Sequence, residues 1–122
     1  MKENILIKRH SSMKHHPLVN CHGGKGSINW TEILDREDSK SEKIRFIHDN
    51  IIPPRSSVGV HQHNNDEEYY YILSGKGIMT LNDEEFEVEE GDLTGVYPGG
   101  SHGLENKSDN DLRVLVICIN QS

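Results

Sequence analysis

The sequence predicts an all-β fold, a sandwich or barrel of short strands preceded by an N-terminal arm. Its 122 residues include no alanine, the best helix former, whereas isoleucine and valine, which suit strands, are frequent. No window longer than about ten residues carries apolar residues at the three- and four-residue spacing of a helix. Short apolar runs bounded by Gly, Pro, Asn and Asp instead recur about every ten residues, a rhythm typical of sandwiches and barrels.

The start of the chain is polar and rich in His and Gly. We interpret residues 1–43 as an arm and a first strand that cover the barrel, and residues 44–122 as the barrel itself, within one domain. The first strand is expected at Ser27–Leu34. The run Asp35–Lys43 that follows has no apolar residue and is expected to be a solvated loop.

Eight further strands are expected, each a short run that ends at turn-forming residues. The runs are Ile44–Ile52, Val58–His63, Glu68–Leu73, Gly77–Leu81, Glu84–Glu89, Asp92–Val96, His102–Asn106 and Leu112–Ile119. The turns between them are Pro53-Pro54, Asn64–Asp66, Ser74–Lys76, Asn82-Asp83, Glu90-Gly91, Pro98–Gly100 and Lys107–Asp111. The acidic residues around Glu84–Glu89 fit the solvated face of a hairpin.

Composition argues against strongly anionic partners. Thirteen Lys and Arg against twenty Asp and Glu give a net charge of −7, which repels nucleic-acid phosphates and anionic membrane surfaces. Met1–Arg9 lacks the apolar stretch of a secretion signal, so a cytoplasmic protein is expected. Cys21 and Cys118 form no CxxC pair and are expected to be free thiols. With 33% hydrophobic residues the core should be thin, which favours burial against a second copy in a homodimer.

Histidines at strand spacing suggest a metal site. His61 and His63 are two residues apart, so on a strand both imidazoles point to one face. A third histidine, His102, follows a Pro-Gly-Gly turn. Each of these features is common without a metal, and the spacing alone leaves that alternative open.

A carboxylate on the next strand can complete such a site. Glu67 and Glu68 are adjacent, so only one of them can face inward. An inward Glu68 would turn Tyr70 inward with it, and an inward Glu67 would turn Tyr69 inward. The apolar pattern of the strand does not decide between the two.

The spacing of these residues resembles the first consensus motif of the cupin superfamily, G-x5-H-x-H-x4-E-x6-G. In this sequence the motif runs from Arg55 through His61, His63 and Glu68 to Gly75. The six-residue count to the final glycine selects Glu68 over its neighbour. Arg55 departs from the motif, which has glycine there.

The second cupin motif, G-x5-P-x-G-x2-H-x3-N, is matched from Gly91 through Gly99 and His102 to Asn106. Tyr97 stands at the position of the motif proline. The two motifs span Arg55 to Asn106, a little under half of the chain. The resemblance implies a small double-stranded β-helix, or jelly-roll, barrel that holds a metal.

The metal ligands implied by the resemblance are His61, His63, Glu68 and His102. Three imidazoles and one carboxylate suit a single divalent transition metal, Fe, Mn, Ni, Co, Cu or Zn, better than Ca or Mg, which prefer oxygen ligands. A six-coordinate metal with four protein ligands keeps two positions for water or a chelating molecule.

Tyr70, Tyr97 and Arg45 are the candidates for substrate contacts. Tyr70 either touches the substrate or packs in the interior. Tyr97 can offer a phenol near the pocket, and Arg45 either binds an anionic substrate or is exposed or ion-paired. Trp30 and His48 lie on strands that cover the barrel mouth in this family. The other histidines are expected to be disordered or at the surface, with adventitious metal binding as the alternative; they are His10, His15, His16 and His22.

The resemblance implies a metal-dependent enzyme, an oxidoreductase such as a dioxygenase, an isomerase or a lyase, that acts on a small chelating metabolite. The alternative is a non-catalytic module that binds or senses a small molecule or a metal. The bare barrel, without a lid or second barrel, favours this alternative. Fold and ligands do not choose among these functions.

Overall fold

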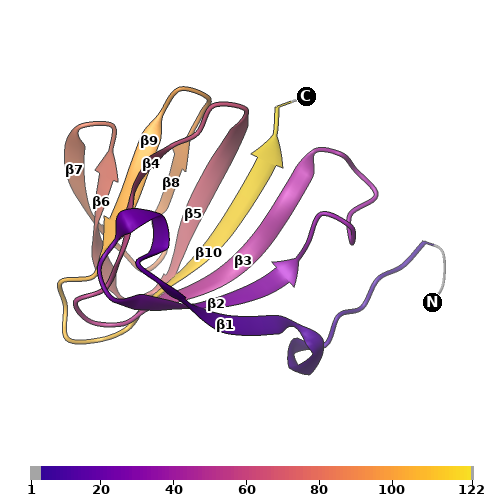
Figure 1. Cartoon of the computed structure of the whole chain (residues 1–122), viewed down its shortest axis with the longest axis horizontal. Helices are drawn as coiled ribbons and strands as arrows, with labels where there is room; N and C mark the ends of the chain where they lie inside the picture. Colours follow the sequence, from indigo (N-terminus) through magenta and orange to yellow (C-terminus); the bar gives the residue numbers. More distant parts are fainter. Residues whose placement is uncertain (1–3, 122) are drawn as a thin grey trace.

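The computed structural model describes residues 4–121, and its two antiparallel sheets form a barrel (Figure 1). The six-stranded sheet has the order β1-β2-β3-β10-β5-β8, and the four-stranded sheet has the order β4-β9-β6-β7. The strands are β1 (Lys14–Val19), β2 (Ser27–Leu34), β3 (Ile44–Ile52), β4 (Ser57–Gln62), β5 (Asp66–Ser74), β6 (Lys76–Leu81), β7 (Glu84–Glu89), β8 (Leu93–Val96), β9 (Ser101–Glu105) and β10 (Leu112–Asn120). Two short 3-10 turns, η1 (His10–Ser12) and η2 (Cys21–Gly23), flank β1.

The core lies between the two sheets and draws on both. Its buried apolar residues are Ile28, Ile52, Val58, Tyr70, Ile72, Met79, Val88, Leu104, Leu112, Val114 and Val116. Alternation on β5 places Glu68, Tyr70 and Ile72 inside, and Tyr71 outside. This confirms that Glu68 is the inward carboxylate.

The all-β prediction is confirmed, and three strands, β2, β3 and β7, have the bounds expected from the sequence. The interpretation of the segment before residue 27 was wrong in one respect, because it contains the strand β1. Pro17 lies inside β1 and disguises it, since proline cannot donate to a sheet ladder. The strand tolerates it because β1 is the edge of the six-stranded sheet, paired only with β2. The division of the chain into an arm, residues 1–43, and a barrel, residues 44–122, stays a prediction. Residues 1–3 of the arm and residue 122 of the barrel lie outside the described residues.

Arg55 takes the backbone conformation that the motif glycine would take. Its φ is 68°, in the left-handed region, as Gly75, Gly91 and Gly99 have φ of 91°, 91° and 97°. The guanidinium offsets this strain, because it donates to the carbonyl oxygens of Lys107 and Ser108 at 2.9 and 2.6 Å. The turn before β4 therefore keeps its shape without glycine. Within residues 4–121, no helix is long and apolar enough to cross a membrane.

Candidate metal centre

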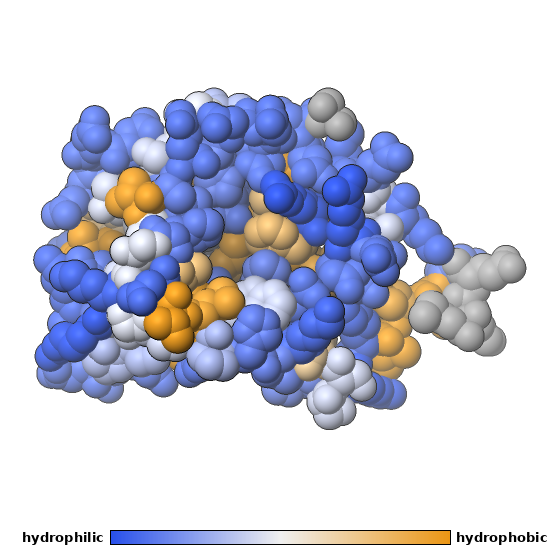
Figure 2. Space-filling model, in the orientation of Figure 1, coloured by the Kyte–Doolittle hydropathy of each residue, from blue (hydrophilic) through white to orange (hydrophobic). Residues whose placement is uncertain are grey.

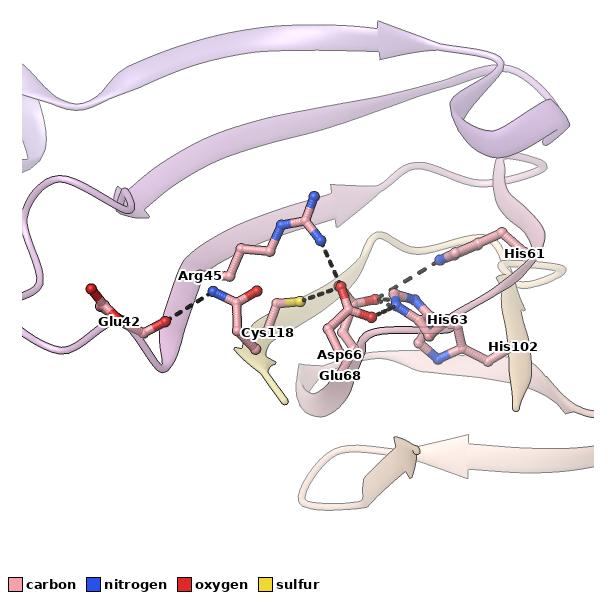
Figure 3. A network of polar contacts seen from close by, with 9 residues as sticks. Glu42, Arg45, His61, His63, Asp66, Glu68, His102 and Cys118 are labelled. Atoms are coloured by element: carbon pink, nitrogen blue, oxygen red, sulfur yellow. Dashed lines mark hydrogen bonds and ion pairs between the residues drawn. The ribbon is translucent and has the colours of Figure 1, made fainter. Parts of the chain in front are cut away.

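The four residues of the expected ligand set converge from both sheets (Figure 3). His61 on β4 pairs directly with His102 on β9, and His63 follows β4 by one residue. Glu68 points toward them from β5 in the opposite sheet. One nitrogen or oxygen atom from each residue lies within 4.8 Å of the others.

The distances between these atoms fit a metal. Glu68 Oε1 lies 3.0 Å from His102 Nε2, 3.3 Å from His63 Nε2 and 3.9 Å from His61 Nε2. The Nε2 atoms of His63 and His102 are 3.2 Å apart. Two ligands at right angles on bonds of about 2.1 Å are about 3.0 Å apart, so the atoms of His63, Glu68 and His102 have a spacing compatible with a shared ion.

Two of the histidines are oriented by hydrogen bonds from their other ring nitrogen. His61 Nδ1 donates to the carbonyl oxygen of Gly59 at 2.8 Å, and His63 Nδ1 donates to Asp66 Oδ1 at 2.7 Å. Each bond keeps the proton on Nδ1 and leaves the Nε2 lone pair free for a metal. Sequence reasoning missed Asp66, which also accepts from Arg45 Nη1 at 2.7 Å and from Cys118 Sγ at 3.4 Å (Figure 3). Asp66 therefore ties β3 and β10 to His63, one of the candidate ligands.

His102 differs from the other two histidines. It is fully buried, and its Nδ1 has no hydrogen-bond partner among residues 4–121. Its ring packs against the buried Tyr70, with centroids 4.5 Å apart. Packing against Tyr70 and the contact of Nε2 with Glu68 Oε1 at 3.0 Å thus hold the His102 ring.

The charges of the cluster are set by burial and mutual contact. Burial by itself would raise the pKa of Glu68, but the close contacts of its carboxylate with His102, His61 and His63 hold this pKa far below its usual range. The contacts with Glu68 and Asp66 raise the pKa of His63, whereas burial lowers that of His102. Glu68 is therefore an ionised carboxylate, as a metal ligand must be.

The cluster opens into a cavity of about 540 Å³. Polar groups line one part of it, including Arg45, Asn50 and Gln62, and apolar groups line another. Figure 2 shows a hollow in this face with hydrophobic residues at its floor and hydrophilic residues around its rim. The apolar lining comprises Leu18, Trp30, Phe46, Val58, Tyr70 and Val116.

The candidate substrate contacts divide into two groups. Arg45 and Tyr70 line the cavity, as do Trp30 and His48. Arg45 is also paired with Asp66, the alternative that the sequence left open. Tyr97 is 63% exposed and lies outside this lining, near Tyr69, so the structure does not bring it to the cluster of candidate ligands.

His22, expected at the surface, lines the cavity instead. Its ring stacks on His61, with centroids 3.7 Å apart and planes at 13°. The backbone there is left-handed, with a φ of 51°. No period or motif marks this residue, because tertiary packing alone brings η2 to β4.

Two glycines allow this approach. A Cβ on Gly59 would lie 2.1 Å from the His22 carbonyl oxygen, and one on Gly24 would lie 2.2 Å from the Ser57 carbonyl oxygen. Backbone hydrogen bonds, including Ser57 N to Lys25 O at 2.9 Å, fix the two segments together. The glycine in Val58-Gly59-Val60 was the available signal for a close contact at this point.

Known proteins share this architecture. Residues 50–118 match the family model for the cupin domain. The chain is 34% identical to the oxalate-binding protein of Thermotoga maritima over 120 aligned residues, and this alignment covers 98% of each chain. A crystal structure of a predicted oxalate decarboxylase from Thermotoga maritima has a TM-score of 0.88 at 33% identity, over 94% of this chain and 99% of that chain. The polyketide cyclase RemF from Streptomyces resistomycificus shares the fold, with a TM-score of 0.75 at 21% identity over 96% and 81% of the two chains. The family model and the full-length relative together show that the chain belongs to the cupin family.

Proposed function

We propose that the protein binds one divalent transition metal through His61, His63, Glu68 and His102, and that this metal holds a small chelating carboxylate of the oxalate class. The observation that supports this most strongly is the convergence of the four ligand atoms at an open cavity. When bound, the metal acts as a Lewis acid toward a carboxylate oxygen. The protein's own residues orient the ligands and receive the rest of the bound molecule.

The cavity supports an anionic ligand. Arg45 and the amide side chains of Gln62, Asn64 and Asn65 line it and can donate hydrogen bonds. Both carboxylates in the lining are already engaged, Glu68 by the three histidines and Asp66 by His63 and Arg45. Their charges therefore oppose the ligand less than free carboxylates would. The Thermotoga maritima relative is named for oxalate binding, which agrees with this ligand class.

Binding without turnover is the simplest function of this arrangement. A reaction would also need a group that moves a proton beside the ligand. Because Asp66 and Glu68 are engaged, the groups available for this are the two imidazoles in the lining that are not candidate ligands, His22 and His48. A metal-dependent lyase or oxygenase is the second candidate. The free imidazole of His22, which has no hydrogen bond among the described residues, favours it as a proton carrier.

The test begins with metal content. The chain is purified without a histidine tag, and its metals are measured together with those of a His61→Ala, His63→Ala double variant. Stoichiometric transition metal in the wild type and its loss in the double variant are expected. Oxalate is then titrated into metal-loaded and metal-free protein by calorimetry, with product and oxygen uptake followed in parallel. Oxalate binding of equal strength without metal would contradict the proposal, and product formation would favour the lyase or oxygenase.

A further inference from the structure

The cavity is much larger than the ligand class proposed above requires. Its volume of about 540 Å³ equals that of about eighteen water molecules in the liquid, whereas oxalate fills the space of roughly three. A ligand that only chelates the metal would leave most of this space to water. Water is a poor match for the apolar part of the lining.

Strand register shows where the apolar part lies relative to the metal ligands. Glu68 pairs with Cys118 across β5 and β10, and Cys118 pairs with Phe46 across β10 and β3. All three side chains line the cavity. Because neighbouring strands are about 4.8 Å apart, Phe46 lies about 10 Å from Glu68 along the sheet.

The floor between these two points is made of small side chains. Cys118 and Val116 on β10 both line the cavity and are buried beneath it. Cys118 is held by Asp66, and burial raises the pKa of its thiol, which keeps it neutral. The two side chains of the floor, Cys118 and Val116, are thus uncharged, and the Asp66–Arg45 ion pair borders the floor beside Cys118. Their small size leaves room for a ligand to cross from β5 to β3.

An aromatic wall stands at the far side. The rings of Phe46 and His48 are stacked, with centroids 3.9 Å apart and planes at 7°, and the Trp30 ring meets His48 edge-on at 5.0 Å. Burial lowers the pKa of His48 to about 4, so its ring is neutral near pH 7 and adds aromatic rather than charged surface. Such a wall suits a flat apolar group.

We propose that the ligand carries an apolar, aromatic body about one ring in size beyond its chelating carboxylate, and that this body lies over Cys118 and Val116 against Phe46, His48 and Trp30. This inference rests on the proposed function, because the metal end of the ligand is the chelate described above. It narrows the ligand class from any small chelating acid to an aryl-substituted one. The metal fixes one end of the molecule, and the wall selects the other.

The experiment uses two hydroxy acids that chelate alike. Glycolate and mandelate share the same hydroxyl and carboxylate, and mandelate adds a phenyl group. Each is titrated by calorimetry into the full chain reconstituted with Zn²⁺, and oxalate is titrated in parallel. Burial of the phenyl group should make mandelate bind about tenfold to a hundredfold more tightly than glycolate. Trp30 is the only tryptophan in the sequence, so its fluorescence should change with mandelate and not with glycolate.

Variants of the wall give the local test. Phe46→Ala should lower the mandelate-to-glycolate affinity ratio about tenfold, and Phe46→Leu, which keeps apolar bulk, should lower it less. Phe86 is the matched control, because it is the only other phenylalanine, is 44% exposed on β7 and is absent from the cavity lining. Phe86→Ala should leave the ratio unchanged.

The outcomes separate this inference from the function on which it rests. If oxalate binds to the Zn²⁺ protein and mandelate binds no more tightly than glycolate, the aromatic-body inference is overturned and the chelating site stands. If oxalate, glycolate and mandelate all fail to bind, both proposals fall. An equal loss of the affinity ratio in Phe86→Ala would also overturn the assignment of the body to the wall.

Discussion

Asp66→Asn should weaken metal binding although Asp66 is not a ligand. The Asp66 carboxylate accepts from His63 Nδ1 with one oxygen and from Arg45 with the other, both at 2.7 Å. Asparagine has a single oxygen, so it can serve only one of these donors and presents an NH₂ group to the other. Loss of such an outer hydrogen bond costs about tenfold to a hundredfold in metal affinity, or about 1.4 to 2.7 kcal/mol. The assay is a competition titration of Zn²⁺ into metal-free protein against a chelator of known affinity.

Asp49 provides the matched control. Like Asp66, it is a buried carboxylate paired with an arginine, since Arg113 Nη2 donates to Asp49 Oδ2 at 2.6 Å. Unlike Asp66, it is not in the cavity lining. Asp49→Asn should lower the free energy of unfolding without changing Zn²⁺ affinity. Wild-type affinity in Asp66→Asn, or an equal loss in Asp49→Asn, would refute the assignment of His63 orientation to Asp66.

Four further predictions follow from the same contacts. Burial lowers the pKa of His48 to about 4, although Glu68 opposes this shift. The contribution of the neutral ring to the free energy of unfolding is therefore complete above about pH 6.5 and is lost as the pH falls toward 4. In urea unfolding, the free energy of unfolding of His48→Gln should fall by up to about 2 kcal/mol less than that of the wild type between about pH 7 and pH 5. Gly59→Ala should lower the free energy of unfolding by about 2 kcal/mol or more, because its Cβ would clash with backbone, whereas Gly100→Ala, with no atom nearer than 3.2 Å, should cost less in the same assay. Tyr70→Phe should weaken oxalate binding by about 1 kcal/mol in calorimetry if its hydroxyl touches the ligand, and unchanged affinity would leave Tyr70 as a packing residue. Sedimentation at micromolar concentration should show a homodimer, and a species of 13.9 kDa alone would contradict it.

Local sequence accounted for most of the strands. The absence of alanine and the short apolar runs between turn residues were enough to predict these strands, because strand alternation and turn formation depend on residues near each other in the chain. The sequence did not predict β1, because Pro17 breaks the local strand pattern. The proline is tolerated there only because β1 lies at the edge of the sheet. Arg55 shows the reverse case, because the residue that departs from the motif adopts a left-handed backbone conformation while carbonyl groups distant in the chain hold its side chain.

The sequence by itself determined the candidate ligand set through its resemblance to the two cupin motifs, because each motif is a spacing of residues within a short stretch of the chain. It did not determine what surrounds that set. His22 reaches His61 through a close contact with Gly59, and Asp66 reaches His63 while it binds Arg45 from another strand. The aromatic wall likewise depends on β3 lying between β2 and β10 in one sheet, and β3 and β10 are far apart in the chain. Such contacts leave no periodic trace in the sequence, since the residues that meet are distant from one another along it. Only the tertiary structure therefore shows the size and lining of the cavity, on which the choice of ligand depends.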